Sequence, residues 1–344
     1  MIKAKRLKKG DKIATVSLSR GSAGDFGINE RYKIAKKRIQ DIFELEVMEM
    51  PNSMKGSEYL YKNPKARAED MMQAFSDKSI KGIFCNIGGD ETIRLLPHID
   101  FNIIKNNPKI FMGYSDTTAN HFMCYKAGLT SFYGPSILDS FAENVEMHDY
   151  TTKWLKKVLF SNEEIGEIEN SNYWTSEYID WANSENNKIK RKVQSNKGYE
   201  LLQGEGIVSG KLIGGCMEVI EMIKATDIWP KNEEWNDKIL FLETSEDRPS
   251  PDWIKYWLRN YGTIGIFDRI KAIIVGKPKD EKYFEEYKNE YTKVVGEEFG
   301  KKDLPILYNM NFGHTSPMCI LPYGVEAKID CGEKNFHIVE SGVM

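Results

Sequence analysis

The stretch IFMGYSDTTANHF, residues 110–122, runs from an apolar segment through Gly113 into a polar cluster and then into a helix-like pattern. An apolar strand that turns directly into a helix is typical of a parallel sheet whose strands alternate with helices. In that arrangement Ser115 lies at the carboxyl end of its strand, where open parallel sheets bind ligands. The local pattern alone favours a simpler role for Ser115 or Asp116 as a helix N-cap, since Thr117 stands where the motif G-x-S-x-G requires its second glycine.

The same alternation extends over most of the chain. Short apolar runs predict strands at residues 12–17, 45–50, 82–87, 109–112, 206–213, 238–243, 272–276, 324–329 and 336–339. Helical spacing is found at residues 29–43, after Asn63-Pro64, and at residues 216–224 and 253–261. From about residue 140 to residue 201 the chain is polar and aromatic with few aliphatic side chains, which favours a linker with a long functional loop. We expect an N-terminal α/β domain over residues 1–140, a linker and aromatic insert over 141–204, and a C-terminal α/β domain over 205–344.

Composition argues against several classes of protein. The chain of 344 residues is 41% hydrophobic and 29% charged, enough to bury a sizeable core. Its 48 basic and 51 acidic residues give a net charge of −3 and no electrostatic reason to expect nucleic acid or an anionic membrane as partner. No apolar run has the length of a membrane span, and the basic N-terminus lacks the apolar segment of a signal peptide. The five cysteines are scattered without C-x-x-C spacing, so we expect no zinc site and a cytoplasmic location.

A serine nucleophile needs a general base, and the base needs a carboxylate that orients it. Among the five histidines, His314 follows a glycine in a loop between two apolar segments, although most single histidines are structural. Glu243 ends the run KILFLE and is better placed to be buried than Glu246 or Asp247 in the polar loop that follows. The residues alone therefore indicate a serine, a glutamate and a histidine at element ends where a cleft can lie.

Seven segments occur in an order that carries a family resemblance: KKGDKIATVS, SIKGIFCNIGGDETIRLLPHID, KIFMGYSDTT, TSFYGPSIL, VSGKLIGGCMEVI, ILFLETSEDRPSP and NMNFGHTSP. With them the chain resembles the serine peptidase family of L,D-carboxypeptidases (S66), and within it the branch of microcin C immunity proteins. The resemblance implies a flavodoxin-like or class I amidotransferase-like doubly wound parallel sheet, followed by a smaller C-terminal mixed α/β domain. It also implies a triad of Ser115 as nucleophile, His314 as base and Glu243 as its orienter, no metal or other cofactor, and a homodimer.

Further site residues follow from the resemblance. The oxyanion hole of the family corresponds here to the N–H groups of Gly89 and Asp116. The rest of the glycine loop, Gly88 and Asp90, is expected to contact the substrate.

The aromatic stretch YWTSEYIDWAN, residues 173–183, is similar to an insert of the immunity branch that stacks on adenine. Trp174 and Trp181 are the candidates, either for base stacking, which contributes roughly 1–3 kcal/mol per base, or for packing the insert onto the body. The family's GGN reads Gly214-Gly215-Cys216 here, which places in question any substrate contact made by that asparagine.

The function expected is acyl transfer to water. The favoured substrate is a peptidyl- or aminoacyl-nucleotide, whose cleavage detoxifies a microcin C-like antibiotic. One alternative is an L,D-carboxypeptidase that releases D-Ala from murein tetrapeptide. The other is a non-catalytic protein that binds a nucleotide or peptide in the same cleft.

Overall fold

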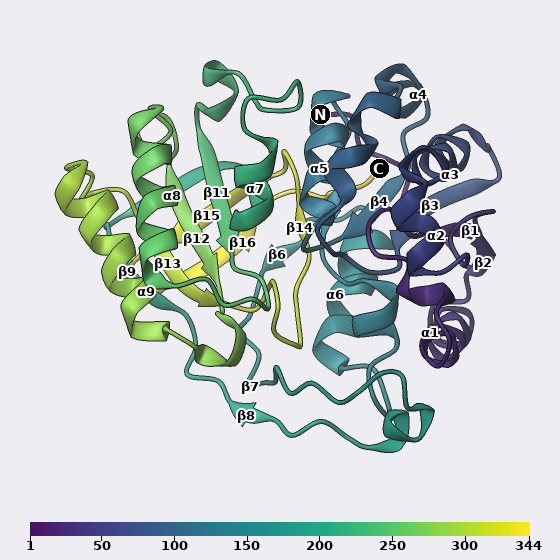
Figure 1. The fold of residues 1–344 in the computed structure, drawn as a ribbon. Coiled ribbons are helices and arrows are strands. Elements are labelled where there is room, and N and C mark those ends of the chain that lie inside the picture. The colour runs from purple at the N-terminus through teal and green to yellow at the C-terminus, as the bar shows by residue number, and fades with distance from the viewer.

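The computed structural model describes residues 1–344, which form two α/β units side by side (Figure 1). The first unit is built on a six-stranded sheet of order β14-β5-β4-β3-β1-β2, in which all neighbours except β14 are parallel. Its strands are β1 (Lys12–Val16), β2 (Glu46–Glu49), β3 (Ile80–Cys85), β4 (Ile110–Gly113), β5 (Phe132–Tyr133) and β14 (Leu321–Pro322). The predicted doubly wound parallel sheet is confirmed.

The strand order explains where a ligand can reach this sheet. The strand β2 lies on one side of β1, whereas β3, β4 and β5 lie on the other, so the direction of winding reverses between β1 and β3. Clefts form beyond the carboxyl ends of the strands at such a switch point. The segments that leave β1, β3 and β4 therefore meet at one edge of the sheet. They carry Arg20, Gly88 and Ser115.

The second unit contains an eight-stranded sheet of order β6-β16-β15-β10-β11-β12-β13-β9. Its four central strands are parallel and its outer strands are antiparallel. The strands are β6 (Gly166–Glu167), β9 (Glu200–Gln203), β10 (Ile207–Cys216), β11 (Lys238–Glu243), β12 (Ala272–Gly276), β13 (Ile306–Met310), β15 (Glu326–Asp330) and β16 (Asn335–Ile338). This mixed α/β unit was expected to be the smaller of the two, yet it carries the larger sheet because residues 141–204 add two edge strands to it.

Helices cover both sheets. They are α1 (Ile28–Phe43), α2 (Ser57–Lys62), α3 (Pro64–Ser76), α4 (Phe101–Asn106), α5 (Thr117–Lys126), α6 (Asp149–Leu159), α7 (Met217–Ile223), α8 (Pro251–Thr263) and α9 (Phe284–Tyr291). Every residue of β4 and β12 is buried, as expected for parallel strands with both faces covered. The two chain ends lie together in Figure 1, where the N–H of Met344 donates to the carbonyl oxygen of Ala4.

The segment 141–204 contains more regular structure than its polar composition suggested. The helix α6 buries Trp154, Leu155 and Val158 against the core. The remainder is a long loop that holds the short pair β7 (Tyr173–Trp174) and β8 (Gln194–Ser195) and runs below both units in Figure 1. Only this later part of the segment matches the expected insert.

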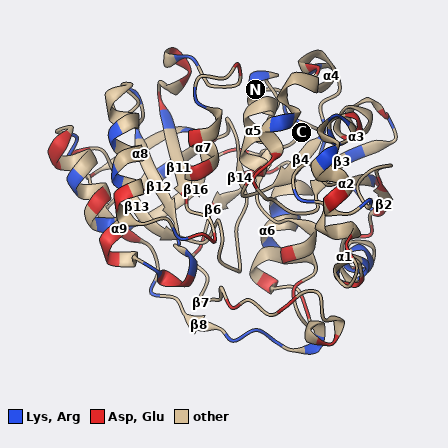
Figure 2. Ribbon diagram, viewed as in Figure 1, with Lys and Arg blue, Asp and Glu red and all other residues tan.

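Charged residues of both signs are spread over the two units. Lysine, arginine, aspartate and glutamate alternate over both units in Figure 2. None of the helices combines the length and the apolar character that crossing a membrane requires. No three side chains of histidine, cysteine, aspartate or glutamate are grouped as metal ligands.

Candidate active site

Ser115 lies in a sharp turn between β4 and α5. Its φ of +62° is unusual for a residue with a side chain, and such strain is concentrated at functional sites. Two glycines make room for the turn. A Cβ on Gly113 would lie 2.8 Å from the hydroxyl oxygen of Thr117, and a Cβ on Gly88 would lie 2.8 Å from the Cβ of Ser115. The turn therefore displays the Ser115 hydroxyl only with glycine at both positions.

His314 connects Ser115 with Glu243. Its Nε2 lies 3.0 Å from the Oγ of Ser115, and its Nδ1 lies 2.7 Å from Oε2 of Glu243. Ser115 follows β4 of the first unit, whereas Glu243 ends β11 and His314 follows β13 of the second unit. The structure thus joins the three predicted side chains across the boundary between the units, in the arrangement of a nucleophile, a base and an orienting carboxylate.

Glu243 is held by a tightly packed surrounding. Its carboxylate is buried, and a Cβ on Gly313 would lie 2.6 Å from Oε2 of Glu243, so only glycine fits directly before His314. The hydroxyl of Tyr133 donates to Oε1 of Glu243 at 2.5 Å and accepts the N–H of Ser115 at 3.1 Å. Tyr133 thus links Glu243 to the Ser115 turn. The sequence analysis did not single it out, although it is the tyrosine of the segment TSFYGPSIL.

The surroundings of His314 favour its protonated form. Burial lowers the pKa of His314, but the charges and hydrogen bonds of Glu243 and Glu246 outweigh it and raise the pKa to about 10. Glu246 approaches His314 Nε2 at 3.0 Å. The hydrogen bond to His314, opposed by partial burial, lowers the pKa of Glu246 to about 2. His314 therefore lies between two carboxylates in this structure.

His121, the nearest other histidine to Ser115 in the sequence, has no part in this cluster. It is fully buried on α5, where its ring bonds to the Ser131 hydroxyl and to the carbonyl oxygen of Gly113. Burial lowers the pKa of His121 to about 3, so it is a neutral packing residue.

The two expected oxyanion donors have no partner within the protein. Neither the N–H of Gly89 nor that of Asp116 donates to any acceptor. The carboxylate of Asp116 accepts from Ser19 Oγ at 2.5 Å and from the N–H groups of Glu91 and Thr92 at 2.8 Å. It thereby fixes the glycine loop beside the Ser115 turn, so the side chain of Asp116 is structural while its N–H stays free.

The rest of the glycine loop divides between pocket and solvent. Gly88 and Gly89 line the pocket described below, whereas Asp90 is exposed and does not. The prediction of Asp90 as a substrate contact is therefore not supported by its position. The loop turns outward after Gly89, whose φ of +149° only glycine adopts readily.

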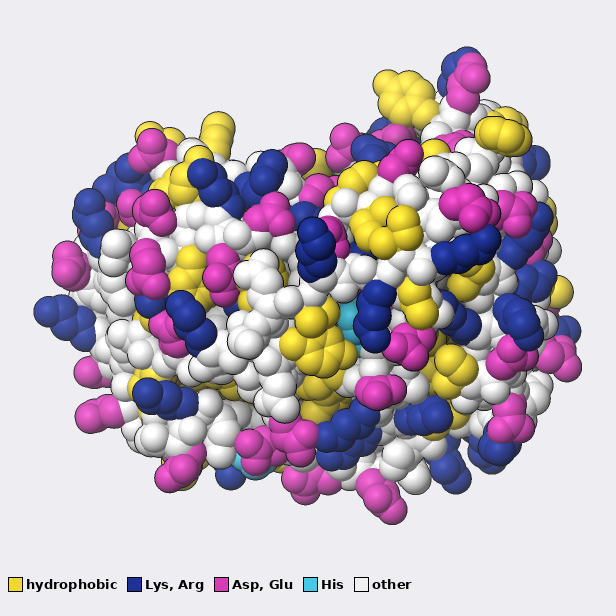
Figure 3. Space-filling model, turned by 90° about the horizontal axis from the view of Figure 1, so that it is seen from below, with side chains coloured by type: hydrophobic (Ala, Val, Ile, Leu, Met, Phe, Trp, Pro, Cys, Tyr) yellow, Lys and Arg dark blue, Asp and Glu magenta, His cyan; other side chains and the backbone are white.

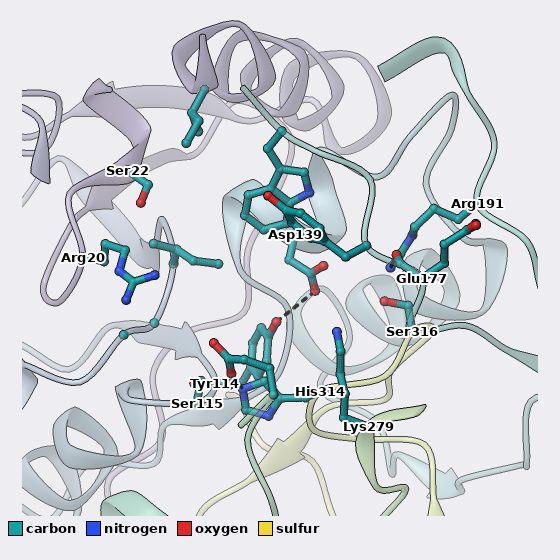
Figure 4. Close-up of a pocket in the computed structure, with 17 residues that line it drawn as sticks. Arg20, Ser22, Tyr114, Ser115, Asp139, Glu177, Arg191, Lys279, His314 and Ser316 are labelled. Atoms are coloured by element: carbon teal, nitrogen blue, oxygen red, sulfur yellow. Dashed lines mark hydrogen bonds and ion pairs between the residues drawn. The ribbon is translucent and has the colours of Figure 1, made fainter. Parts of the chain in front are cut away.

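A pocket of about 410 Å³ opens onto Ser115 and His314. Residues of both units and of the insert line it, and the labelled side chains converge on it in Figure 4. Its charged lining side chains are Arg20, Asp139, Glu177, Arg191, Glu246 and Lys279. Figure 3 shows, on the face seen from below, hydrophobic side chains at the centre with both charges around them.

The insert contributes aromatic rings to this pocket, and only one of them was predicted. Trp181 and Tyr178 both line it, with ring centroids 6.1 Å apart, and the guanidinium of Arg31 lies 4.7 Å from the Trp181 ring. Trp174 is 1% exposed, packs under the ammonium group of Lys277, and does not reach the pocket. Of the two roles considered for Trp174 the structure favours packing, and Tyr178 is the second aromatic ring of the insert that lines the pocket.

Cys216, which replaces the asparagine of the family, is buried at the end of β10. Its thiol donates to Glu218 at 3.2 Å, and its N–H donates to the hydroxyl of Thr118 on α5. The other oxygen of Glu218 accepts the N–H of Ser245 at 2.9 Å. Position 216 thus supports the loop after Glu243 and does not line the pocket.

Comparison with known families defines the class of the protein. Models of the LD-carboxypeptidase N-terminal and C-terminal domains match residues 13–134 and 209–329. The chain belongs to the LD-carboxypeptidase family, peptidase family S66. This confirms the family resemblance stated from the sequence.

Within the family, the chain is similar to the microcin C7 self-immunity protein MccF of Escherichia coli. The two are 35% identical over 283 residues, which cover 80% of this chain and 78% of MccF. A Bacillus subtilis protein named "Probable murein peptide carboxypeptidase" is 27% identical over 83% of this chain and 79% of its own.

Solved structures agree with this placement. The MccF-like protein of Streptococcus pneumoniae in complex with AMP has a TM-score of 0.89 and 35% identity, with 96% of this chain and 99% of that chain covered. MccF in complex with aspartyl sulfamoyl adenosine has a TM-score of 0.86 and 28% identity, with both chains covered completely.

Proposed function

We propose that this protein is a serine hydrolase that cleaves the amide-type bond between a peptidyl or aminoacyl group and a nucleotide, and so detoxifies microcin C-like antibiotics. The observation that carries the proposal is the contact chain from Ser115 through His314 to Glu243, which opens into a pocket with aromatic walls. The AMP and aspartyl sulfamoyl adenosine bound by the related proteins support the ligand class.

The mechanism follows from the contacts. His314 Nε2 takes the proton of Ser115 as Oγ bonds to the substrate carbonyl carbon, while Glu243 holds the ring through Nδ1. The N–H groups of Gly89 and Asp116 bind the oxyanion, a contribution of about 10²–10³ in rate per donor. His314 then protonates the leaving nitrogen as the carbon–nitrogen bond breaks. A water molecule, deprotonated by His314, hydrolyses the acyl-enzyme and restores the Ser115 hydroxyl.

The pocket has groups for each part of such a substrate. Trp181 and Tyr178 offer ring faces to a nucleobase, and stacking contributes roughly 1–3 kcal/mol. Arg20 and Lys279 line the same pocket and form no ion pair or side-chain hydrogen bond, so they are free to bind the anionic linkage between base and acyl group.

Three further expectations belong to the proposal. The division into residues 1–140, 141–204 and 205–344 is supported by the two sheets, with β14 crossing from the last segment into the first sheet. A cytoplasmic location is supported by five cysteines that are all buried and free. A homodimer rests on family membership.

The purified protein tests the proposal with two substrates, aspartyl sulfamoyl adenosine and murein tetrapeptide, analysed by mass spectrometry. Cleavage of the first and loss of that cleavage in Ser115→Ala is the expected result. Release of D-Ala from the second without cleavage of the first would make the protein an L,D-carboxypeptidase. Tight binding with activity equal to that of Ser115→Ala would make it a binding protein.

A further inference from the structure

The carboxylate of Glu246 contacts Nε2 of His314, the nitrogen that must accept the Ser115 proton for catalysis. One oxygen of Glu246 lies 3.0 Å from His314 Nε2, the same nitrogen that lies 3.0 Å from Ser115 Oγ. With Glu243 on Nδ1 and Glu246 on Nε2, each ring nitrogen faces a carboxylate, an arrangement that favours a proton on both nitrogens. A doubly protonated ring cannot accept the proton of Ser115. The His314–Ser115 pair therefore becomes active only when the Glu246 carboxylate leaves Nε2.

The two carboxylates on His314 differ in how firmly they are held. The Glu243 side chain is 0% exposed and also accepts the Tyr133 hydroxyl, whereas the Glu246 side chain is 57% exposed. The loop that carries Glu246 is tied on both sides, by the N–H of Ser245 to Glu218 and by Arg248 to Asp280 at 3.1 Å. The backbone is thus held in place while the Glu246 side chain stays free to turn within the pocket.

Charge balance decides what can draw Glu246 away. The charged and titratable groups that face His314 and Glu246 are Glu243 from β11, Tyr114 from the end of β4 and Lys279 from the loop after β12. Tyr114 packs its ring edge-on at 5.1 Å and donates to Asp139, a further carboxylate of the pocket (Figure 4). When an anionic leaving group takes up Lys279 and Arg20, the pocket offers Glu246 no unpaired cation of its own. A positive charge on the acyl side of the substrate then balances this carboxylate.

We propose that Glu246 selects substrates with a free ammonium group next to the scissile carbonyl, and that this ammonium takes the carboxylate from His314. The inference rests on the proposed function and narrows its substrate class to aminoacyl-nucleotides with an unmodified α-amino group. On binding, Glu246 turns to the ammonium, the Nε2 proton passes to water, and the neutral ring accepts the Ser115 proton. A substrate whose α-nitrogen is acylated carries no positive charge at that atom. Glu246 then stays on His314, and the protonated ring cannot act as a base.

The test compares aspartyl sulfamoyl adenosine with its N-acetyl derivative on the wild type and on Glu246→Gln. Since a hydrogen bond to a charged group contributes about 1.5–3 kcal/mol, the wild type is expected to favour the free amine by about tenfold or more in kcat/KM. Glu246→Gln is expected to bring this ratio close to one. Asp247→Asn, an exposed neighbour outside the pocket, is the matched control and is expected to keep the wild-type ratio.

The pH dependence gives a second readout that a loss of packing would not produce. The kcat/KM profile reports ionisations of the free enzyme, and the kcat profile reports those of the enzyme–substrate complex. In the free enzyme the pKa of His314 is raised to about 10. For the free amine, the acid limb of kcat is therefore expected at lower pH than that of kcat/KM. Glu246→Gln is expected to move the acid limb of kcat/KM to lower pH, so that it coincides with the acid limb of kcat.

The possible outcomes distinguish a failure of the proposed role of Glu246 from a failure of the proposed hydrolase function. Equal cleavage of both compounds by the wild type, with no change of ratio in Glu246→Gln, would overturn the inference and leave the hydrolase intact. Cleavage of neither compound would overturn both. If Glu246→Gln fails to fold, binding of the two compounds to Ser115→Ala decides: equal dissociation constants would contradict the role of Glu246.

Discussion

The two sides of the pocket are built in different ways. On one side, the Ser115 turn and Glu243 are buried and surrounded so closely that Gly88, Gly113 and Gly313 cannot carry a Cβ. On the other side, Tyr178 and Glu246 are exposed side chains on long loops, 67% and 57% exposed respectively. The comparison teaches that the catalytic groups depend on backbone positions where no side chain larger than that of glycine fits. Substrate choice depends instead on exposed side chains that can change conformation or be replaced.

This difference predicts that changes on the buried side abolish the reaction. Ser115→Ala is expected to lower kcat by about 10⁴-fold or more, because the nucleophile and its base act as a unit. The stability should hardly change, since only one oxygen atom is removed. Steady-state kinetics and thermal unfolding measure the two effects, and residual activity within tenfold of the wild type would break the comparison.

A second change on the buried side adds a methyl group instead of removing an atom. Gly88→Ala puts its Cβ 2.8 Å from Ser115 Cβ and 2.9 Å from Ser115 Oγ, so the serine must shift. Since a misplacement of about 1 Å costs on the order of 10² in rate, kcat is expected to fall by about that factor. Gly332→Ala is the control, because neither Gly88 nor Gly332 has a positive φ and the nearest atom to a Cβ on Gly332, a carboxylate oxygen of Asp330, lies 3.4 Å away.

Tyr133→Phe tests the link between the two units. The change removes the hydroxyl that bonds to both Glu243 and the N–H of Ser115, while the ring that packs against Phe241 stays. A hydrogen bond to a charged group contributes about 1.5–3 kcal/mol, so kcat is expected to fall by about 10- to 100-fold. An unchanged kcat would show that Glu243 and the Ser115 turn are positioned without Tyr133.

A change on the exposed side is expected to act on binding. Trp181→Ala removes the ring that stands between Arg31 and the pocket, which should raise KM for a nucleotide substrate by about tenfold and leave kcat nearly constant. Trp174→Phe, in the buried position below Lys277, should leave KM unchanged. A larger effect on kcat than on KM for Trp181→Ala would contradict the division of the pocket into a catalytic side and a substrate-binding side.

The sequence predicted the buried side better than the exposed side, for physical reasons. Strand ends and glycines mark where a sheet presents side chains, and these signals indicate Ser115, Glu243 and His314 as candidate positions. Their contact spans 199 residues between Ser115 and His314, which no local pattern can express; the family resemblance supplied it.

The exposed side lacks such markers. Trp174 and Trp181 have similar polar neighbours in the sequence, and a cation lies over each ring in the structure. They differ in burial, since Trp174 is 1% exposed whereas Trp181 is half-buried and lines the pocket. Glu246 was set aside as a loop residue because nothing in TSEDRPSP indicates that the loop bends back to His314. The strand β14 has only two residues and lies far along the chain from the sheet it joins, so its pairing was not predictable.

The most direct test of the central claim is covalent labelling with a fluorophosphonate, read by peptide mass spectrometry. We predict that one label is attached, that it lies on Ser115, and that His314→Ala prevents the labelling while Cys216→Ala does not. An active enzyme in which the reagent leaves Ser115 unmodified, or labels it equally well without His314, would contradict the account.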